Sequence, residues 1–129
     1  MGNIKIGCQT YPWKMNQKRF AGDVPHMVKT ASDAGFLGLE AEIGMLGAYF
    51  EHPERVREIL EAYGMQLAAL VLHQSWEGEE ENQEEAELTG KAISFLKYFP
   101  WAKLMVSHHA GTKSRGEGEE LQKRRENLL

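Results

Sequence analysis

Residues that can bind a cation or move a proton follow three of the apolar stretches in this sequence. Glu40 ends the first of these stretches, His73 follows the second, and the pair His108 and His109 follows the third. Carboxylates and imidazoles serve as general acids and bases and as ligands of divalent metals. Their repeated position behind similar segments predicts one site that is assembled from several parts of the chain.

The segments that must position these residues are predicted as alternating strands and helices. Short apolar runs bounded by turn residues predict strands at 4–9, 36–41, 65–72 and 103–107. Apolar residues recur at helical spacing between these strands, and Gly35, Gly64 and Pro100 are expected to end the three helices. Asp23 is the expected N-cap of the first helix. Residues 119–129 are predicted as a fourth helix.

The spacing of the predicted strands indicates a parallel sheet. They begin at intervals of roughly 30–37 residues, and strand–helix alternation at this period predicts right-handed βαβ units in an α/β fold. Four such units fit either an open doubly wound sheet or half of an eight-stranded barrel, and neither the period nor the hydrophobicity separates the two. No glycine-rich phosphate loop follows the first strand, which argues against a dinucleotide-binding fold.

Composition indicates one globular domain that spans residues 1–129, with 42% hydrophobic residues and a formal net charge of -4. No apolar run approaches the roughly 20 residues that a membrane span needs, and the N-terminus lacks the pattern of a signal peptide. Cys8 is the only cysteine, which excludes a disulfide framework, so we expect a cytoplasmic protein. The acidic balance does not favour nucleic acid as a partner.

Three motifs resemble one protein family. Residues 5–13, Lys-Ile-Gly-Cys-Gln-Thr-Tyr-Pro-Trp, resemble the opening of the sugar phosphate isomerase/epimerase family, the xylose isomerase-like TIM barrels. Residues 34–40, Ala-Gly-Phe-Leu-Gly-Leu-Glu, resemble its second strand, and residues 109–111, His-Ala-Gly, resemble its His-x-Gly turn at the fourth strand. The motifs occur in the family's order and at barrel spacing, and the resemblance covers nearly the whole chain. It favours half of a TIM (β/α)8 barrel over the doubly wound sheet.

The resemblance implies an active site at the C-terminal face of the barrel. Members of the family hold a divalent metal, often Mn or Mg and sometimes Co or Zn. They move a proton between neighbouring carbons of a sugar, a sugar phosphate or a hydroxy-ketone through an enediolate. Their metal ligands and catalytic glutamates lie on strands five to eight, whereas this chain is expected to stop before strand five. The resemblance therefore assigns no catalytic residue here, and we expect the isolated N-terminal half to be inactive.

Five residues are candidates for the substrate site that the resemblance implies. Tyr11 and Trp13 follow the first strand and either wall an apolar side of a sugar pocket or belong to the core. Glu40 either shapes the sugar site or pairs with a cation at the barrel rim. His73 and His109 are candidates for metal ligation, for substrate contact or for a structural hydrogen bond. Two histidines without a third ligand do not make a metal site.

Two other functions are open from the sequence. One is a non-enzymatic half-barrel whose inner face and sheet edges pair with a second copy, as a homodimer, or with another half-barrel. The other is a fragment of an abasic-site endonuclease. That related branch of the superfamily places zinc-binding histidines at strands three and four, where His73 and His109 lie. The acidic charge of this chain argues against the endonuclease.

Overall fold

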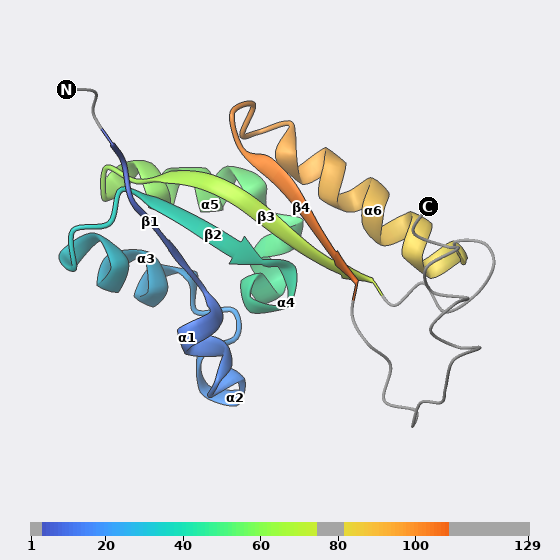
Figure 1. Cartoon of the computed structure of the whole chain (residues 1–129), viewed down its shortest axis with the longest axis horizontal. Coiled ribbons are helices and arrows are strands. Elements are labelled where there is room, and N and C mark those ends of the chain that lie inside the picture. The colour runs from blue at the N-terminus through green and yellow to red at the C-terminus, as the bar shows by residue number, and fades with distance from the viewer. Residues whose placement is uncertain (1–3, 75–81, 109–129) are drawn as a thin grey trace.

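A computed structural model describes residues 4–74 and 82–108 of the chain, which form an α/β fold on one parallel sheet (Figure 1). The strands are β1 (Gly7–Gln9), β2 (Gly38–Glu42), β3 (Gln66–Gln74) and β4 (Lys103–His108). They lie in the order β1-β2-β3-β4, and each is parallel to its neighbour. The α/β class and the parallel sheet that the sequence predicts are therefore confirmed.

Helices fill the three connections between consecutive strands. The first connection holds α1 (Tyr11–Lys14), α2 (Gln17–Phe20) and α3 (Val24–Asp33), and the second holds α4 (Ile43–Leu46), the 3-10 helix η1 (Gly47–Glu51) and α5 (Pro53–Ala62). The third holds α6 (Gln83–Leu96). The three helices predicted between the strands do not include α1, α2, α4 or η1, because one turn of helix carries no readable periodicity. None of the helices in the described residues combines the length and the apolar character that crossing a bilayer requires.

The strand order bears on the two architectures that the sequence left open. A doubly wound sheet reverses its winding, so that a later strand lies on the other side of the first one. Within the described residues, each strand instead adds beside the preceding one. Consecutive right-handed crossovers of this kind place their helices on one face of the sheet. The core agrees with that arrangement, because buried residues of α3, α5 and α6 pack with Leu39 and Ala41 of β2, which share one face.

The glycine stops predicted for the first two helices are confirmed. Gly35 (φ 93°) and Gly64 (φ 67°) adopt the left-handed conformation directly after Ala34 and Tyr63, the C-caps of α3 and α5. The residue after each glycine closes the helix, since the Phe36 amide donates to the Ala31 carbonyl at 3.0 Å and an equivalent bond follows Gly64. At the other end of α3, the Asp23 carboxylate accepts from the backbone amide of His26 at 3.2 Å, as expected of an N-cap.

Several predicted boundaries differ from the observed ones in ways that affect the site. β1 begins only at Gly7, whereas β2 and β3 extend past their predicted ends to Glu42 and Gln74. The third predicted helix, α6, begins at Gln83, where Asn82 and Glu85 form a capping box. The predicted fourth helix, residues 119–129, lies outside the described residues.

Cys8 of β1 packs partly against the core, and burial raises the pKa of its thiol. Because burial disfavours the thiolate, we expect Cys8 to react with iodoacetamide more slowly in the folded chain than in urea at neutral pH. The pH at which the reaction rate begins to increase should also be higher for the folded chain than for the chain in urea. Mass spectrometry of timed samples across a pH series checks this. An equal or faster rate in the folded chain would contradict it.

Candidate functional site

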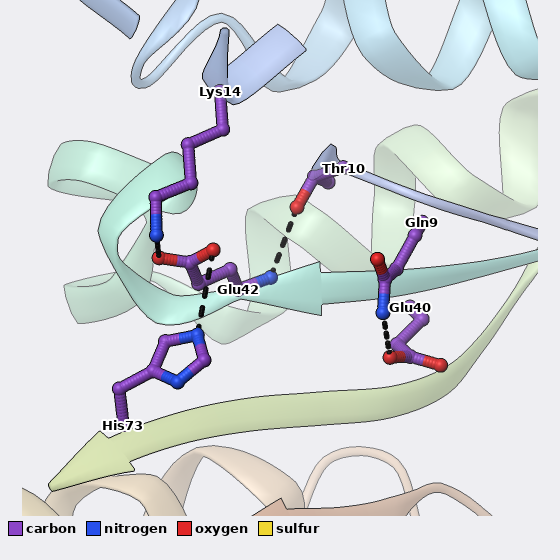
Figure 2. A network of polar contacts seen from close by, with 6 residues as sticks. All are labelled: Gln9, Thr10, Lys14, Glu40, Glu42 and His73. Atoms are coloured by element: carbon purple, nitrogen blue, oxygen red, sulfur yellow. Dashed lines mark hydrogen bonds and ion pairs between the residues drawn. The ribbon is translucent and has the colours of Figure 1, made fainter. Parts of the chain in front are cut away.

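Glu42, the last residue of β2, is the centre of a polar cluster at the carboxyl edge of the sheet (Figure 2). Its Oε1 lies 2.5 Å from Lys14 Nζ, and its Oε2 lies 3.6 Å from His73 Nε2. The three side chains come from α1, β2 and β3, and they are 34%, 16% and 33% exposed, respectively. A carboxylate, an ammonium group and an imidazole therefore meet in a partly buried position that a ligand can reach.

Thr10 holds this cluster together through the backbone. Its side chain is fully buried, and its hydroxyl accepts a hydrogen bond from the Glu42 amide at 3.1 Å. Its own amide donates to the Glu40 carbonyl at 3.0 Å. These two bonds tie the turn after β1 to the end of β2. Because α1 begins at the next residue, Lys14 lies one helical turn later and reaches Glu42.

The alternation of β2 explains why its carboxylates share a face. Leu39 and Ala41 point into the core under the helices, so Glu40 and Glu42 point to the opposite face. Glu42 is paired in register with Val71, and His73 follows two residues later on the same face of β3. The acidic and imidazole side chains thus meet on the face of the sheet that the helices leave open.

These residues surround a pocket of about 150 Å³. It is lined by Gln9, Thr10, Tyr11, Lys14, Glu42, Val71 and His73. Complete sites for small molecules measure roughly 300–1,000 Å³, so this pocket takes one part of a ligand. A larger cavity of about 400 Å³ lies near the start of β3, but its floor is formed by buried apolar residues such as Leu60 and Phe99, and no histidine lines it. We place the candidate site at the polar pocket because, among the described cavities, it alone combines a histidine with a carboxylate and a lysine.

The structure separates the five predicted site residues. His73 and Tyr11 line the pocket. Glu40 is on the same face but lies further from the edge, where its Oε1 accepts a hydrogen bond from the Gln9 side chain at 2.5 Å (Figure 2). Trp13 packs against the hydrophobic core and contacts the His26 ring edge-to-face at 6.3 Å, outside the pocket lining. His109 lies outside the described residues.

Sequence reasoning did not single out Lys14 and Glu42, and it passed over Gln9. Glu42 could have been predicted, because it lies two residues after Glu40, on the same face of the strand and nearer to the strand end. It was missed because the strand was predicted to stop at residue 41. Lys14 had no comparable signal. Its position depends on α1, and a helix of four residues leaves too little pattern to predict.

The described residues supply part of a metal ligand set. Glu42 and His73 offer one oxygen and one nitrogen, whereas a catalytic zinc site takes three protein ligands. Within residues 4–74 and 82–108, no group of three or more His, Cys, Asp or Glu side chains could hold a metal ion. The Lys14 ammonium group already neutralises the Glu42 carboxylate and would compete with a cation there. The second predicted ligand, His109, is not among these residues.

No family model matches this chain, and no curated protein matches it. The resemblance of its motifs to the isomerase/epimerase family therefore stays a hypothesis. A fold by itself does not determine a function, so the function has to be argued from the chemistry of the polar cluster.

Proposed function

We propose that the carboxyl edge of this sheet is the sugar-binding wall of an isomerase/epimerase-like (β/α)8 barrel, to which this chain contributes the first four βα units. The observation that carries the proposal is the meeting of Lys14, Glu42 and His73 from three consecutive units around one pocket. Barrel enzymes bind their substrates at this edge. Sequential parallel strands with helices on one face also agree with a barrel wall.

The pocket offers the groups that a sugar would use. A sugar carries a carbonyl oxygen beside several hydroxyls, and each hydroxyl both donates and accepts hydrogen bonds. Lys14 donates to the carbonyl oxygen, Glu42 accepts from the neighbouring hydroxyl, and His73 serves either role according to its protonation. The ring of Tyr11 lies at the pocket and covers an apolar side of the ligand.

Isomerisation or epimerisation of a sugar by proton transfer next to its carbonyl passes through an enediolate, whose negative charge grows on the carbonyl oxygen. A cation held beside that oxygen stabilises the transition state, because it is in place before the charge develops. Lys14 supplies this cation from the chain itself. A carboxylate and an imidazole together are an established set for enediolate chemistry. We assign Glu42 and His73 to binding and orienting the substrate, since the family resemblance assigns proton abstraction to later strands.

A titration of the 129-residue chain with sugars tests this proposal. We expect aldoses and ketoses, free or phosphorylated, to shift the amide NMR signals of residues around Thr10, Glu42 and His73 in a saturable way. The matching alditols lack the carbonyl and should bind more weakly, because Lys14 loses its acceptor. If no sugar produces saturable shifts at these positions, the proposed function is wrong.

A further inference from the structure

The cavity of about 400 Å³ near the start of β3 has no part in the proposed function. It lies at the amino edge of the sheet, between the end of α5 and the segment that joins α6 to β4 (Figure 1). Gln66 at this cavity and His73 at the sugar pocket are at opposite ends of β3, roughly 23 Å apart. Complete sites for small molecules measure about 300–1,000 Å³. The cavity is therefore separate from the pocket and has room for a whole small ligand.

The inside of this cavity suits a flat apolar group. Its floor is formed by four residues that are at most 3% exposed, namely Leu60, Met65, Leu67 and Phe99. Trp101 lines the same cavity but is 60% exposed, and it makes no ring contact with another described residue. A free indole face beside an apolar floor can pack against an aromatic ring.

Two opposite charges line the same cavity. Arg57 and Glu61 lie one turn apart on α5, and both residues are exposed. Side chains of opposite charge at this spacing commonly pair, but neither of them forms an ion pair within residues 4–74 and 82–108. The Arg57 guanidinium group instead lies over the Tyr98 ring, 5.7 Å from its centroid. Both charges are therefore available to a ligand.

We propose that this cavity binds a free aromatic amino acid. The ligand carboxylate pairs with Arg57, because the planar guanidinium group matches the two carboxylate oxygens. The ligand ammonium group pairs with Glu61 in the last turn of α5, where the helix dipole also favours a cation. The ligand ring lies on the apolar floor beside Trp101. This site is apart from the sugar pocket, and the proposal does not rest on the proposed function.

The positions of the two charges favour an amino acid over a simple acid or amine. Residues one helical turn apart have Cβ atoms about 5–6 Å apart, and the two charged groups of an amino acid share one carbon, so one ligand can reach both side chains. An aromatic acid would pair with Arg57 but would bring its negative charge close to Glu61. An aromatic amine would pair with Glu61 but would bring its positive charge close to Arg57. A zwitterion matches both.

Titrations of the 129-residue chain with related compounds test the proposal. Phenylalanine carries both charges, phenethylamine lacks the carboxylate, hydrocinnamate lacks the ammonium group, and glycine lacks the ring. We expect phenylalanine to shift the amide NMR signals of Gly64 and Gln66 and the indole signal of Trp101 in a saturable way. Phenethylamine and hydrocinnamate should each bind about five- to tenfold more weakly, because each loses one charge pair at a partly exposed position. Glycine should bind more weakly than phenylalanine, because it leaves the apolar floor uncovered.

Two variants separate the roles of the charges. Arg57→Gln should weaken the binding of phenylalanine and hydrocinnamate about five- to tenfold without weakening that of phenethylamine. Glu61→Gln should weaken the binding of phenylalanine and phenethylamine without weakening that of hydrocinnamate. Arg55→Gln and Glu58→Gln are the matched controls, since both residues are exposed on α5 outside the cavity lining. The controls should bind all of these compounds as the wild type does.

The absence of saturable shifts with phenylalanine at these positions would overturn the proposal. So would glycine or either singly charged compound that binds as tightly as phenylalanine, or an equal loss of binding in a variant and its control. If a variant fails to fold by circular dichroism, the comparison of the compounds on the wild-type chain decides. A chain that binds phenylalanine but no sugar would refute only the proposed function, and the reverse result would refute only the amino-acid site.

Discussion

Replacing Glu42 with glutamine is expected to weaken sugar binding by about 10- to 100-fold. The amide keeps the shape of the side chain but loses the charge-assisted hydrogen bond to a sugar hydroxyl, and bonds to charged groups contribute about 1.5–3 kcal/mol. It also removes the ion pair that holds Lys14 at 2.5 Å, so the ammonium group loses its fixed direction. The NMR titration of the 129-residue chain measures the dissociation constant.

The same substitution at Glu51 is the control for this experiment. Glu51 lies in η1 and makes an exposed ion pair with Lys91 at 3.8 Å, away from the pocket. Glu51→Gln should bind sugar as the wild type does. Both variants should unfold within about 1 kcal/mol of the wild type, because exposed and partly exposed ion pairs contribute little to stability. Unchanged binding in Glu42→Gln, or an equal loss in both variants, would contradict the role assigned to Glu42.

The features of the fold that the sequence predicted are those encoded by local patterns. Alternating apolar segments, with glycines at residues 35 and 64, were enough to place the four strands and the three longer helices α3, α5 and α6 in order. Glycine adopts the left-handed conformation that ends a helix more readily than other residues do. A short apolar run between glycine-containing turns is typical of a buried strand. The direction of the sheet followed from the spacing alone, because connections of about thirty residues favour parallel crossovers.

The composition of the site was harder to predict because it depends on contacts between segments. Lys14 reaches Glu42 because Thr10 makes hydrogen bonds that hold the turn after β1 against the end of β2. The sequence around Thr10 does not predict these hydrogen bonds. His73 was found because it follows a long apolar run. Trp13 was harder to assign, since an aromatic residue after a strand can turn towards the pocket or towards the core with little change in its local sequence.

Replacing Gly47 with alanine is expected to destabilise the chain by about 2–4 kcal/mol. A Cβ at this position would lie 2.8 Å from the Cα of Gly22, closer than two such atoms can pack, and φ at Gly47 is +54°. Backbone strain and overpacking each cost about 1–3 kcal/mol. Urea unfolding followed by circular dichroism measures the loss.

The contact between Gly47 and Gly22 also matters for the site. The Gly22 amide donates to the Met45 carbonyl at 2.9 Å, so the loop behind α2 is fastened to α4, which follows Glu42 directly. This second tie, together with Thr10, holds the segment that carries Lys14 beside the end of β2. Gly90→Ala in α6 is the control, because its Cβ would meet nothing within 4 Å and should stabilise the helix by about 0.5–1 kcal/mol. If Gly47→Ala unfolds within about 0.5 kcal/mol of the wild type, well below the usual cost of overpacking, the two segments are not fastened by this contact. The position of Lys14 would then depend on the Thr10 bonds and the Gly22–Met45 hydrogen bond.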